Sequence, residues 1–289
     1  MIEIFYNGRG YDIEQKHFPD GTLNLNGNAF PAHINTIHWH YENDSELFTL
    51  ICLRMKYEND DVELVMPYIP HARMDRVKDD DDVFTLKYFA KTINSLKFSK
   101  VSVFDPHSNV ALALIDNVKV YWPEHHIFDV THHIAFLEEN DVSHQAYEKS
   151  MEDLTFFYPD EGAMKRYSSI FHHNYAFGIK KRDWKTGQIQ GLSIVNEDLV
   201  KGKNILIVDD ICSKGGTFYH SAKALKAAGA KSVSLYVTHC EETITLGELA
   251  ASDGLVDHVY TTRSIFPEKL VKSEHGYDPY WKDWITILD

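Results

Sequence analysis

The sequence predicts an α/β protein of two doubly wound parallel-sheet domains, and two observations lead to this prediction. Short apolar runs alternate with helical patterns along the chain, as they do in βαβ units. These segments are Leu47–Arg54, Val62–Pro67, Val83–Leu96, Val101–Phe104, Ile205–Val208, Phe218–Ala228 and Val233–Val237. They fall into two blocks joined by the polar, acidic stretch Glu138–Glu152, and 289 residues suffice for two ordinary α/β domains. We therefore place the domains at 1–138 and 139–289.

The first block begins with a strand and contains one well-patterned helix. Met1–Tyr6 alternates like a strand and lacks the basic start and apolar core of a signal peptide. The segment Val83–Leu96 predicts a helix whose apolar stripe is made of Val83, Leu86, Ala90, Ile93 and Leu96. The acidic run Asp79–Asp82 precedes this helix. Four acids would suit a cation, but helix caps and first-turn acids explain them as well, and we favour the caps.

Composition limits the partners of the protein. The formal net charge of −14 argues against nucleic acid and anionic membranes, because no basic face is available to collect phosphates. Apolar residues make up 44% of the chain, yet no apolar run approaches the ~20 residues of a membrane helix. Cys52, Cys212 and Cys240 are an odd number without paired or metal-type spacing, which fits a reducing compartment. We expect a soluble, cytoplasmic protein.

The most informative segment is Ile205–Thr217, which reads ILIVDDICSKGGT. Its apolar start is typical of a strand buried on both faces of a parallel sheet, and the acids Asp209 and Asp210 follow where we expect that strand to end. Paired carboxylates suit the vicinal hydroxyls of a ribose. The Gly215–Gly216 pair lets backbone N–H groups close around a phosphate at the start of the helix that Thr217 opens. The order of these features predicts a ribose-phosphate site.

This segment resembles the signature of the phosphoribosyltransferase superfamily. The alternative is an ordinary turn between a strand and a helix, in which Asp and Gly are common. The resemblance implies that both domains have the phosphoribosyltransferase fold. It also implies that the ribose-phosphate group is bound by seven residues of the segment: Asp209, Asp210, Ser213, Lys214, Gly215, Gly216 and Thr217.

Five further motifs, in their order along the chain, resemble those of the ribose-phosphate diphosphokinase (PRPP synthetase) family. They are Phe18–Thr22 (FPDGT), Asn43–Leu47 (NDSEL), Pro67–Arg76 (PYIPHARMDR), Asp105–Asn109 (DPHSN) and Tyr158–Arg166 (YPDEGAMKR). The resemblance runs from about residue 1 to residue 262. It implies an ATP-binding first domain and a cleft between the domains where transfer takes place.

The resemblance also assigns roles to single residues. The residues implied in ATP binding are Phe18, Asp20, Arg73, Asp75 and His107. Lys180 and Arg182 match the Lys-x-Arg pair of a mobile catalytic loop, and His107 is a third catalytic candidate. The metal-binding candidates are His107, Asp160, Asp209 and Asp210. Diphosphoryl transfer needs cations on the developing charge and a metal that bridges the phosphates, which these residue types supply.

Several of these residues have simpler interpretations. Lys180 and Arg182 would also suit a solvated charge cluster, and His107 would suit a hydrogen-bonded loop histidine. The histidine pairs at 125–126, 132–133 and 172–173, with His38 and His40, invite a zinc site. No Cys or acid stands at ligand spacing from them, so we do not expect zinc.

Two segments depart from the resembled family. Its sugar-phosphate loop usually reads DTAGT or DTGGT, whereas this chain has Ser213 in place of the acid and Lys214 in place of the threonine. The change makes the loop more favourable to anions by two charge units. Two interpretations are open: a tighter site for a monophosphate, or an acceptor that carries more phosphate beyond O5. ADP-ribose is such an acceptor, and the chain also resembles relatives that make ADP-ribose 1-diphosphate. Where the family places basic residues of a regulatory inter-subunit site, this chain has Val77–Asp82 (VKDDDD).

The expected reaction is Mg²⁺-dependent transfer of the β,γ-diphosphoryl group of ATP to the anomeric hydroxyl of a 5-phosphorylated ribose, with release of AMP. The acceptor is ribose 5-phosphate or ADP-ribose. The resemblance further implies a homo-oligomer, either a dimer or a hexamer. The alternatives are a phosphoribosyltransferase that consumes PRPP and a catalytically silent regulatory homologue.

Overall fold

A computed structural model describes residues 1–26, 30–139, 144–182, 189–252, 254–267 and 284–288. The chain forms two compact units, Met1–Trp122 and Pro123–Asp289. The first unit therefore ends sixteen residues before the predicted join at 138. The difference is due to helix α4 (Glu124–Glu139), because its residues Ile127 and Val130 pack in the core of the second unit. The acidic stretch 138–152 includes the end of this helix and helix α5 (His144–Glu152).

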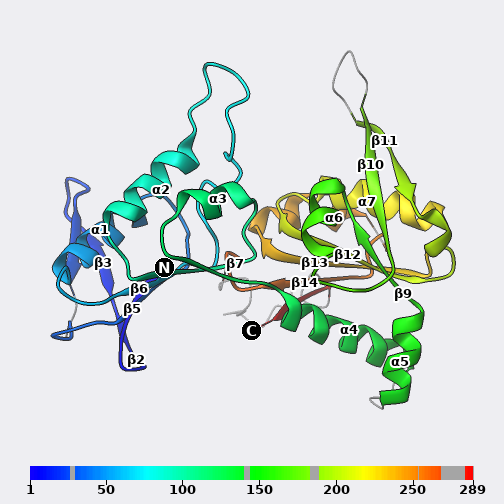
Figure 1. The fold of residues 1–289 in the computed structure, drawn as a ribbon, viewed down its shortest axis with the longest axis horizontal. Helices are drawn as coiled ribbons and strands as arrows, with labels where there is room; N and C mark the ends of the chain where they lie inside the picture. The colour runs from blue at the N-terminus through cyan, green and yellow to red at the C-terminus, as the bar shows by residue number, and fades with distance from the viewer. Residues whose placement is uncertain (27–29, 140–143, 183–188, 253, 268–283, 289) are drawn as a thin grey trace. The chain divides into compact units, whose positions relative to one another are not determined.

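The first unit is a mostly parallel sheet with helices and a separate hairpin. Its strands are β1 (Ile2–Tyr6), β2 (Arg9–Asp12), β3 (Glu14–His17), β4 (Leu23–Asn26), β5 (Thr36–Trp39), β6 (Glu63–Val65), β7 (Lys100–Phe104) and β8 (Val118–Tyr121). Its helices are α1 (Glu46–Lys56), α2 (Thr85–Ser95) and α3 (Asn109–Leu114). The main sheet has the order β2-β1-β5-β6-β7-β8 (Figure 1). Strands β5 to β8 are parallel, whereas β1 is antiparallel to both neighbours.

Helix α2 departs from its prediction in two ways. Leu86, Ala90 and Ile93 are buried as expected, but Val83 lies before the helix and is 60% exposed, while Phe89 joins the buried face. The favoured interpretation of Asp79–Asp82 as caps was wrong. The residue before the helix is Phe84, and the Asp82 carboxylate instead accepts the backbone N–H groups of its own turn, from residues 78 and 79.

The second unit is also an α/β layer structure. Its strands are β9 (Leu154–Tyr158), β10 (Tyr175–Arg182), β11 (Ile189–Val195), β12 (Asn204–Cys212), β13 (Ser232–Cys240), β14 (His258–Thr262) and β15 (Ile285–Leu288). Besides α4 and α5, its helices are α6 (Glu161–Tyr167), η1 (Glu197–Leu199), α7 (Gly216–Ala227), η2 (Glu242–Leu246) and α8 (Glu248–Ala251). The sheet order is β11-β10-β9-β12-β13-β14-β15, and the β10–β11 hairpin extends beyond the rest of the sheet (Figure 1).

Strand β12 is buried on both faces, as its apolar sequence predicts. Ile205 and Ile207 pack with α7 in one core cluster, whereas Leu206 and Val208 pack on the other face with residues of α4 and α6. The strand is parallel to β9 on one side and to β13 on the other. All pairings in this sheet are parallel except β10 with β11, so the predicted α/β class with parallel sheets is confirmed.

No helix within the described part of the chain is both long and apolar enough to span a membrane.

Candidate active site

The two adjacent acids lie within β12, not after it. Asp209 pairs with Val237 of β13, and the pairing continues to Cys212 and Cys240. On the other side, the pairing with β9 ends at Ile207. The carboxylates therefore stand beyond the end of β9, at the carboxyl edge of the parallel sheet, where ligands bind in open α/β sheets.

The Asp210 carboxylate forms an ion pair with Arg166. Nη1 of Arg166, on α6, lies 2.8 Å from Oδ1 of Asp210, and the two side chains are 17% and 4% exposed. At such burial, removing one partner of a charge pair leaves the other charge uncompensated and is strongly destabilising. Arg166 belongs to the segment Tyr158–Arg166, but the sequence did not assign it a partner.

Within the described part of the chain, no ion pair is found for the neighbouring Asp209 carboxylate. Burial is the main cause that raises the pKa of Asp209 well above its usual value, and the charges of Asp210 and Asp160 raise it further. The backbone N–H of Asp210 donates to Oδ1 of Asp209 at 2.9 Å and acts in the opposite direction. This site accumulates negative charge at a partly buried position, which fits a cation or sugar hydroxyls as ligands.

Asp160 has a structural role in this site. It is the N-cap of α6, and its Oδ1 accepts the backbone N–H groups of Gly162 and Ala163 at 3.0 and 3.1 Å. Its carboxylate is close enough for its charge to act on Asp209. Sequence alone placed Asp160 as a metal-binding acid. The structure adds that one of its oxygens is already used as a helix cap.

The predicted phosphate loop has the shape that the glycines suggest. Gly215 adopts φ +78° and is the N-cap of α7, so α7 begins at Gly216, one residue before the predicted Thr217. A Cβ on Gly216 would meet no atom within 4 Å, so the backbone of this residue is open to a ligand. The first N–H groups of a helix have no partner inside the helix, which makes this position suitable for an anion.

A segment that the sequence did not single out lines this loop. We call residues 241–249 the loop wall. The backbone N–H of Glu241 donates to the carbonyl of Cys212 at 2.8 Å, and the hydroxyls of Thr243 and Ser213 lie 3.1 Å apart. A Cβ on Gly247 would lie 1.8 Å from the carbonyl oxygen of Lys214. Of these residues, only Gly247 could have been noticed in the sequence, because a glycine can mark a close approach of two backbones.

The backbone of Lys180 and Arg182 lies at the end of β10, paired with Leu192 and Ile189 of β11. Their side chains, and the loop between the two strands, lie outside the described residues. Their catalytic role stays a prediction. On the same strand, a Cβ on Gly178 would lie 2.7 Å from the carbonyl oxygen of Pro159, so β10 packs closely beside the residue before Asp160.

In the first unit, the FPDGT motif forms the turn of the β3–β4 hairpin. The backbone N–H of Phe18 donates to the carbonyl of Thr22, and Asp20 accepts from both the N–H and the hydroxyl of Thr22 at 3.0 and 2.7 Å. These bonds hold the pKa of Asp20 below its usual value. The ring of Phe18 is 52% exposed, which leaves it free to stack on a planar ligand.

The structure brings Asp75 and His107 together, although 31 residues separate them. Asp75 is buried, and Nε of Arg76 donates to its Oδ1 at 2.8 Å. Burial alone would raise the pKa of Asp75, but the bond from Arg76 and the charges of Arg76 and His107 outweigh it, so the pKa is lowered. Arg73 is exposed on the same segment. Three of the five predicted ATP-binding residues thus come from two neighbouring segments.

Among the described residues, no three His, Cys, Asp or Glu side chains gather as a metal-ligand set. Mg²⁺ requires few protein ligands, because it keeps waters and takes oxygens from substrate phosphates. Asp209 is the described carboxylate that fits this role best, since neighbouring negative charges destabilise its ionised form.

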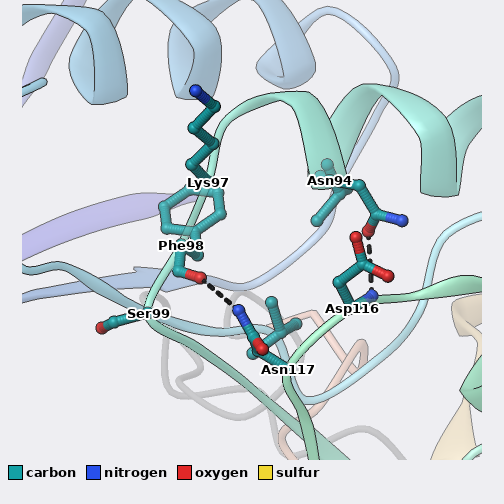
Figure 2. A pocket seen from close by; sticks show the side chains of 8 residues that line it. Asn94, Lys97, Phe98, Ser99, Asp116 and Asn117 are labelled. Atoms are coloured by element: carbon teal, nitrogen blue, oxygen red, sulfur yellow. Dashed lines mark hydrogen bonds between the residues drawn. The ribbon is translucent and has the colours of Figure 1, made fainter.

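A pocket of about 330 Å³ lies in the first unit, beside the residues that precede the amino ends of β7 and β8 (Figure 2). Its polar lining includes Asn94, Lys97 and Asp116. Oδ1 of Asn94 accepts the backbone N–H of Asp116 at 3.0 Å. None of the predicted site residues lines it.

Comparison with known proteins agrees with this geometry. A phosphoribosyl transferase domain matches residues 169–258, which include β12, the phosphate loop and the loop wall. The ribose-phosphate pyrophosphokinase of Thermococcus kodakarensis is 25% identical over 263 residues, covering 88% of this chain and 86% of its own. That of Pyrococcus abyssi is 28% identical over 244 residues, covering 82% and 79%. The chain is thus similar in sequence to ribose-phosphate pyrophosphokinases over most of its length.

The fold of these proteins is also shared. The crystal structure of phosphoribosylpyrophosphate synthetase from Mycobacterium smegmatis matches with a TM-score of 0.68 at 18% identity, covering 96% of this chain and 86% of that one. The predicted fold, two α/β domains of the phosphoribosyltransferase type, agrees with this match. The resemblance to the ribose-phosphate pyrophosphokinases is confirmed by the sequence comparisons, which cover 82–88% of the chain.

Proposed function

We propose that this homologue of ribose-phosphate pyrophosphokinases is a Mg²⁺-dependent diphosphotransferase. It transfers the β,γ-diphosphoryl group of ATP to the anomeric hydroxyl of a 5-phosphorylated ribose and releases AMP. The observation that carries the proposal is the arrangement at the end of β12. Two adjacent carboxylates are followed by a left-handed glycine at the start of α7.

In this proposal, Asp209 and Asp210 hold the 2- and 3-hydroxyls of the ribose. Arg166 keeps the Asp210 carboxylate in place through its ion pair. The open backbone at Gly216 and the first turn of α7 bind the 5-phosphate. Bound Mg²⁺, held by Asp209 and by substrate phosphates, would neutralise charge on the transferred group.

The nucleotide is bound by residues of the first unit in this proposal. Phe18 stacks on the adenine, and Arg73 contacts the phosphates. Asp75 holds His107 beside the triphosphate. Since Phe18 and Asp20 stand on an exposed hairpin, a second copy of the chain can receive them, so we expect a homo-oligomer. Lys180 and Arg182 meet charge on the β-phosphorus in the transition state.

The acceptor is ribose 5-phosphate or ADP-ribose. The carboxylates and glycines serve both. Lys214 is exposed at the loop, where its charge suits either a terminal phosphate or a diphosphate. Ser213 is smaller than the acid of the resembled family, which leaves more room for a substituent on the 5-phosphate. Competing the two acceptors at equal concentration decides between them. A kcat/KM for ribose 5-phosphate about 100-fold higher, equal to ~2.7 kcal/mol of transition-state preference, would exclude ADP-ribose.

The proposal is tested by incubating the protein with ATP, Mg²⁺ and each acceptor, then identifying the nucleotide product. We expect AMP and not ADP. A phosphoribosyltransferase would consume PRPP and leave ATP intact, and a silent homologue would form no nucleotide product. Either result would overturn the proposal.

A further inference from the structure

Thr243 of the loop wall is in polar side-chain contact with Ser213 of the phosphate loop. The Ser213 and Thr243 hydroxyl oxygens lie 3.1 Å apart, and the Thr243 hydroxyl donates to Oε2 of Glu241 at 3.3 Å. The backbone N–H of Glu241 is itself bonded to the carbonyl of Cys212, the residue before Ser213. The three side chains therefore form a short chain of hydrogen bonds that starts and ends at the loop.

Counting hydrogens fixes the direction of this chain. A hydroxyl has one hydrogen to donate, and an ionised carboxylate can only accept. Thr243 uses its hydrogen on Glu241, so it can only accept from Ser213. Ser213 must then donate its own hydrogen to Thr243, which leaves lone pairs, and no hydrogen, for a ligand in the loop.

We infer that Thr243 and Glu241 are positioning residues that hold Ser213 as a hydrogen-bond acceptor for the anomeric hydroxyl of the bound sugar. The 2- and 3-hydroxyls are not available to Ser213, because they already donate to Asp209 and Asp210 in the proposed site. This inference rests on the proposed ribose-phosphate site. Because a phosphate oxygen offers no hydrogen at neutral pH, Ser213 set in this way cannot donate to the 5-phosphate. Ser213 instead accepts a hydrogen bond from the anomeric hydroxyl, and the backbone at Gly216 binds the phosphate.

The other contacts of the loop wall make this arrangement rigid. Gly247 lies against the carbonyl of Lys214. The side chain of Leu249 packs against Gly215, because a Cβ on Gly215 would lie 2.8 Å from the Cβ of Leu249. Each of the residues 212 to 215 thus has a partner in the wall. A loop fixed at four successive positions keeps the Ser213–Thr243 geometry before the ligand arrives, so little ordering is left for binding.

The test is calorimetric titration of each variant with two probes. One probe is ribose 5-phosphate or ADP-ribose, whichever binds the wild type more tightly, and the other is inorganic phosphate. Thr243→Val removes the acceptor of Ser213 and frees its hydrogen, whereas Thr243→Ser keeps it. We expect Thr243→Val and Ser213→Ala each to weaken the binding of the sugar phosphate about three- to tenfold, the range of one hydrogen bond, and not to weaken the binding of inorganic phosphate. Thr243→Ser should bind like the wild type.

Two controls make the result specific. Thr245→Val changes the same 3₁₀ segment, but its hydroxyl bonds to the carbonyl of Glu242, so it should leave both affinities unchanged. The double variant Ser213→Ala with Thr243→Val should bind no more weakly than Ser213→Ala alone, because both changes remove one interaction. Melting temperatures of all variants show that each is folded.

Equal weakening toward both probes, additive effects, or no effect of Thr243→Val would overturn the inference. So would a wild-type chain that binds neither ribose 5-phosphate nor ADP-ribose. A wild type that binds the sugar phosphate with the expected variant pattern but releases no AMP from ATP would overturn the proposed reaction and leave this inference standing.

Discussion

Two neighbouring carboxylates at the end of β12 lie in opposite surroundings. Asp210 is paired with Arg166 at 2.8 Å, whereas Asp209 is desolvated and faces the negative charges of Asp210 and Asp160. Because the pKa of Asp209 is raised in the folded state, its ionisation costs stability as pH rises from about 4 through the raised pKa. In the absence of a ligand, ionised Asp209 destabilises the fold at neutral pH, whereas removal of the Asp210 carboxylate would leave the guanidinium of Arg166 uncompensated.

We therefore expect opposite effects of two conservative changes at pH 7 in EDTA. Asp209→Asn removes the destabilising charge and should raise the free energy of unfolding. Asp210→Asn leaves the partly buried Arg166 guanidinium without its carboxylate and should lower the free energy of unfolding by about 2 kcal/mol. Urea denaturation measures both. A larger loss for Asp209→Asn than for Asp210→Asn would contradict this account of the pair.

At the end of β10, Lys180→Ala and Arg182→Ala should each lower kcat by ~10²-fold or more and change the dissociation constant of ATP little. The reason is that charge on the transferred group develops only in the transition state. Steady-state kinetics with a separate ATP-binding measurement tests this. If affinity fell and kcat did not, the catalytic assignment of these two residues would be wrong.

The loop wall and the phosphate loop form one structural element, although about 25 residues separate them in sequence. The close approach of Gly247 to the Lys214 carbonyl is its tightest point. Gly247→Ala should force the backbones apart and lower the free energy of unfolding by about 1–3 kcal/mol. Gly216→Ala is the matched control, because its Cβ meets nothing within 4 Å and alanine favours the helix by up to ~1 kcal/mol. Similar stability losses in both variants, measured by urea denaturation, would contradict the close packing of Gly247.

In the second sheet, His258 at the start of β14 lies against the edge strand β15. Its Nε2 lies 2.7 Å from the Thr286 hydroxyl, and burial, aided by the charge of His133, lowers its pKa to about 4. The unfolded chain therefore binds a proton more readily than the folded one, so stability should fall as pH drops from about 6.5 toward 4. His258→Gln should show a smaller loss over this range in urea denaturation. An identical pH dependence for both proteins would show that His258 does not contribute.

Sequence reasoning succeeded where one segment carries the whole signal. The apolar run of β12, its two acids and the glycines before α7 are contiguous, so the strand, the turn and the helix were all predictable. The Arg166–Asp210 pair, the contact of Thr243 with Ser213 and the Asp75–His107 pair join distant segments, and no pattern within one sequence specifies such pairs. Val83 was wrongly assigned to helix α2, because its spacing from Leu86 and Ala90 continues the apolar stripe of the helix although the helix begins at Thr85.

At the scale of the whole molecule, the chain consists of two units with parallel sheets, and the predicted chemistry is divided between them. The ribose-phosphate residues lie in the second unit, and the nucleotide candidates lie in the first. The join was predicted sixteen residues late, at the acidic stretch Glu138–Glu152, because a single sequence does not show that Ile127, Val130 and Ile134 of α4 pack in the core of the second unit. Homology to the ribose-phosphate pyrophosphokinases covers both units, which is the reason to expect both substrates on one chain.

The central claim, that this chain transfers a diphosphoryl group, is tested most directly by ³¹P NMR of the reaction. The protein is mixed with Mg²⁺, ATP and either ribose 5-phosphate or ADP-ribose, and the phosphorus signals are followed over time. The account predicts that AMP appears in equal amount with an acceptor that has gained two linked phosphorus atoms. Formation of ADP with a singly phosphorylated acceptor, or release of inorganic phosphate alone, would contradict it.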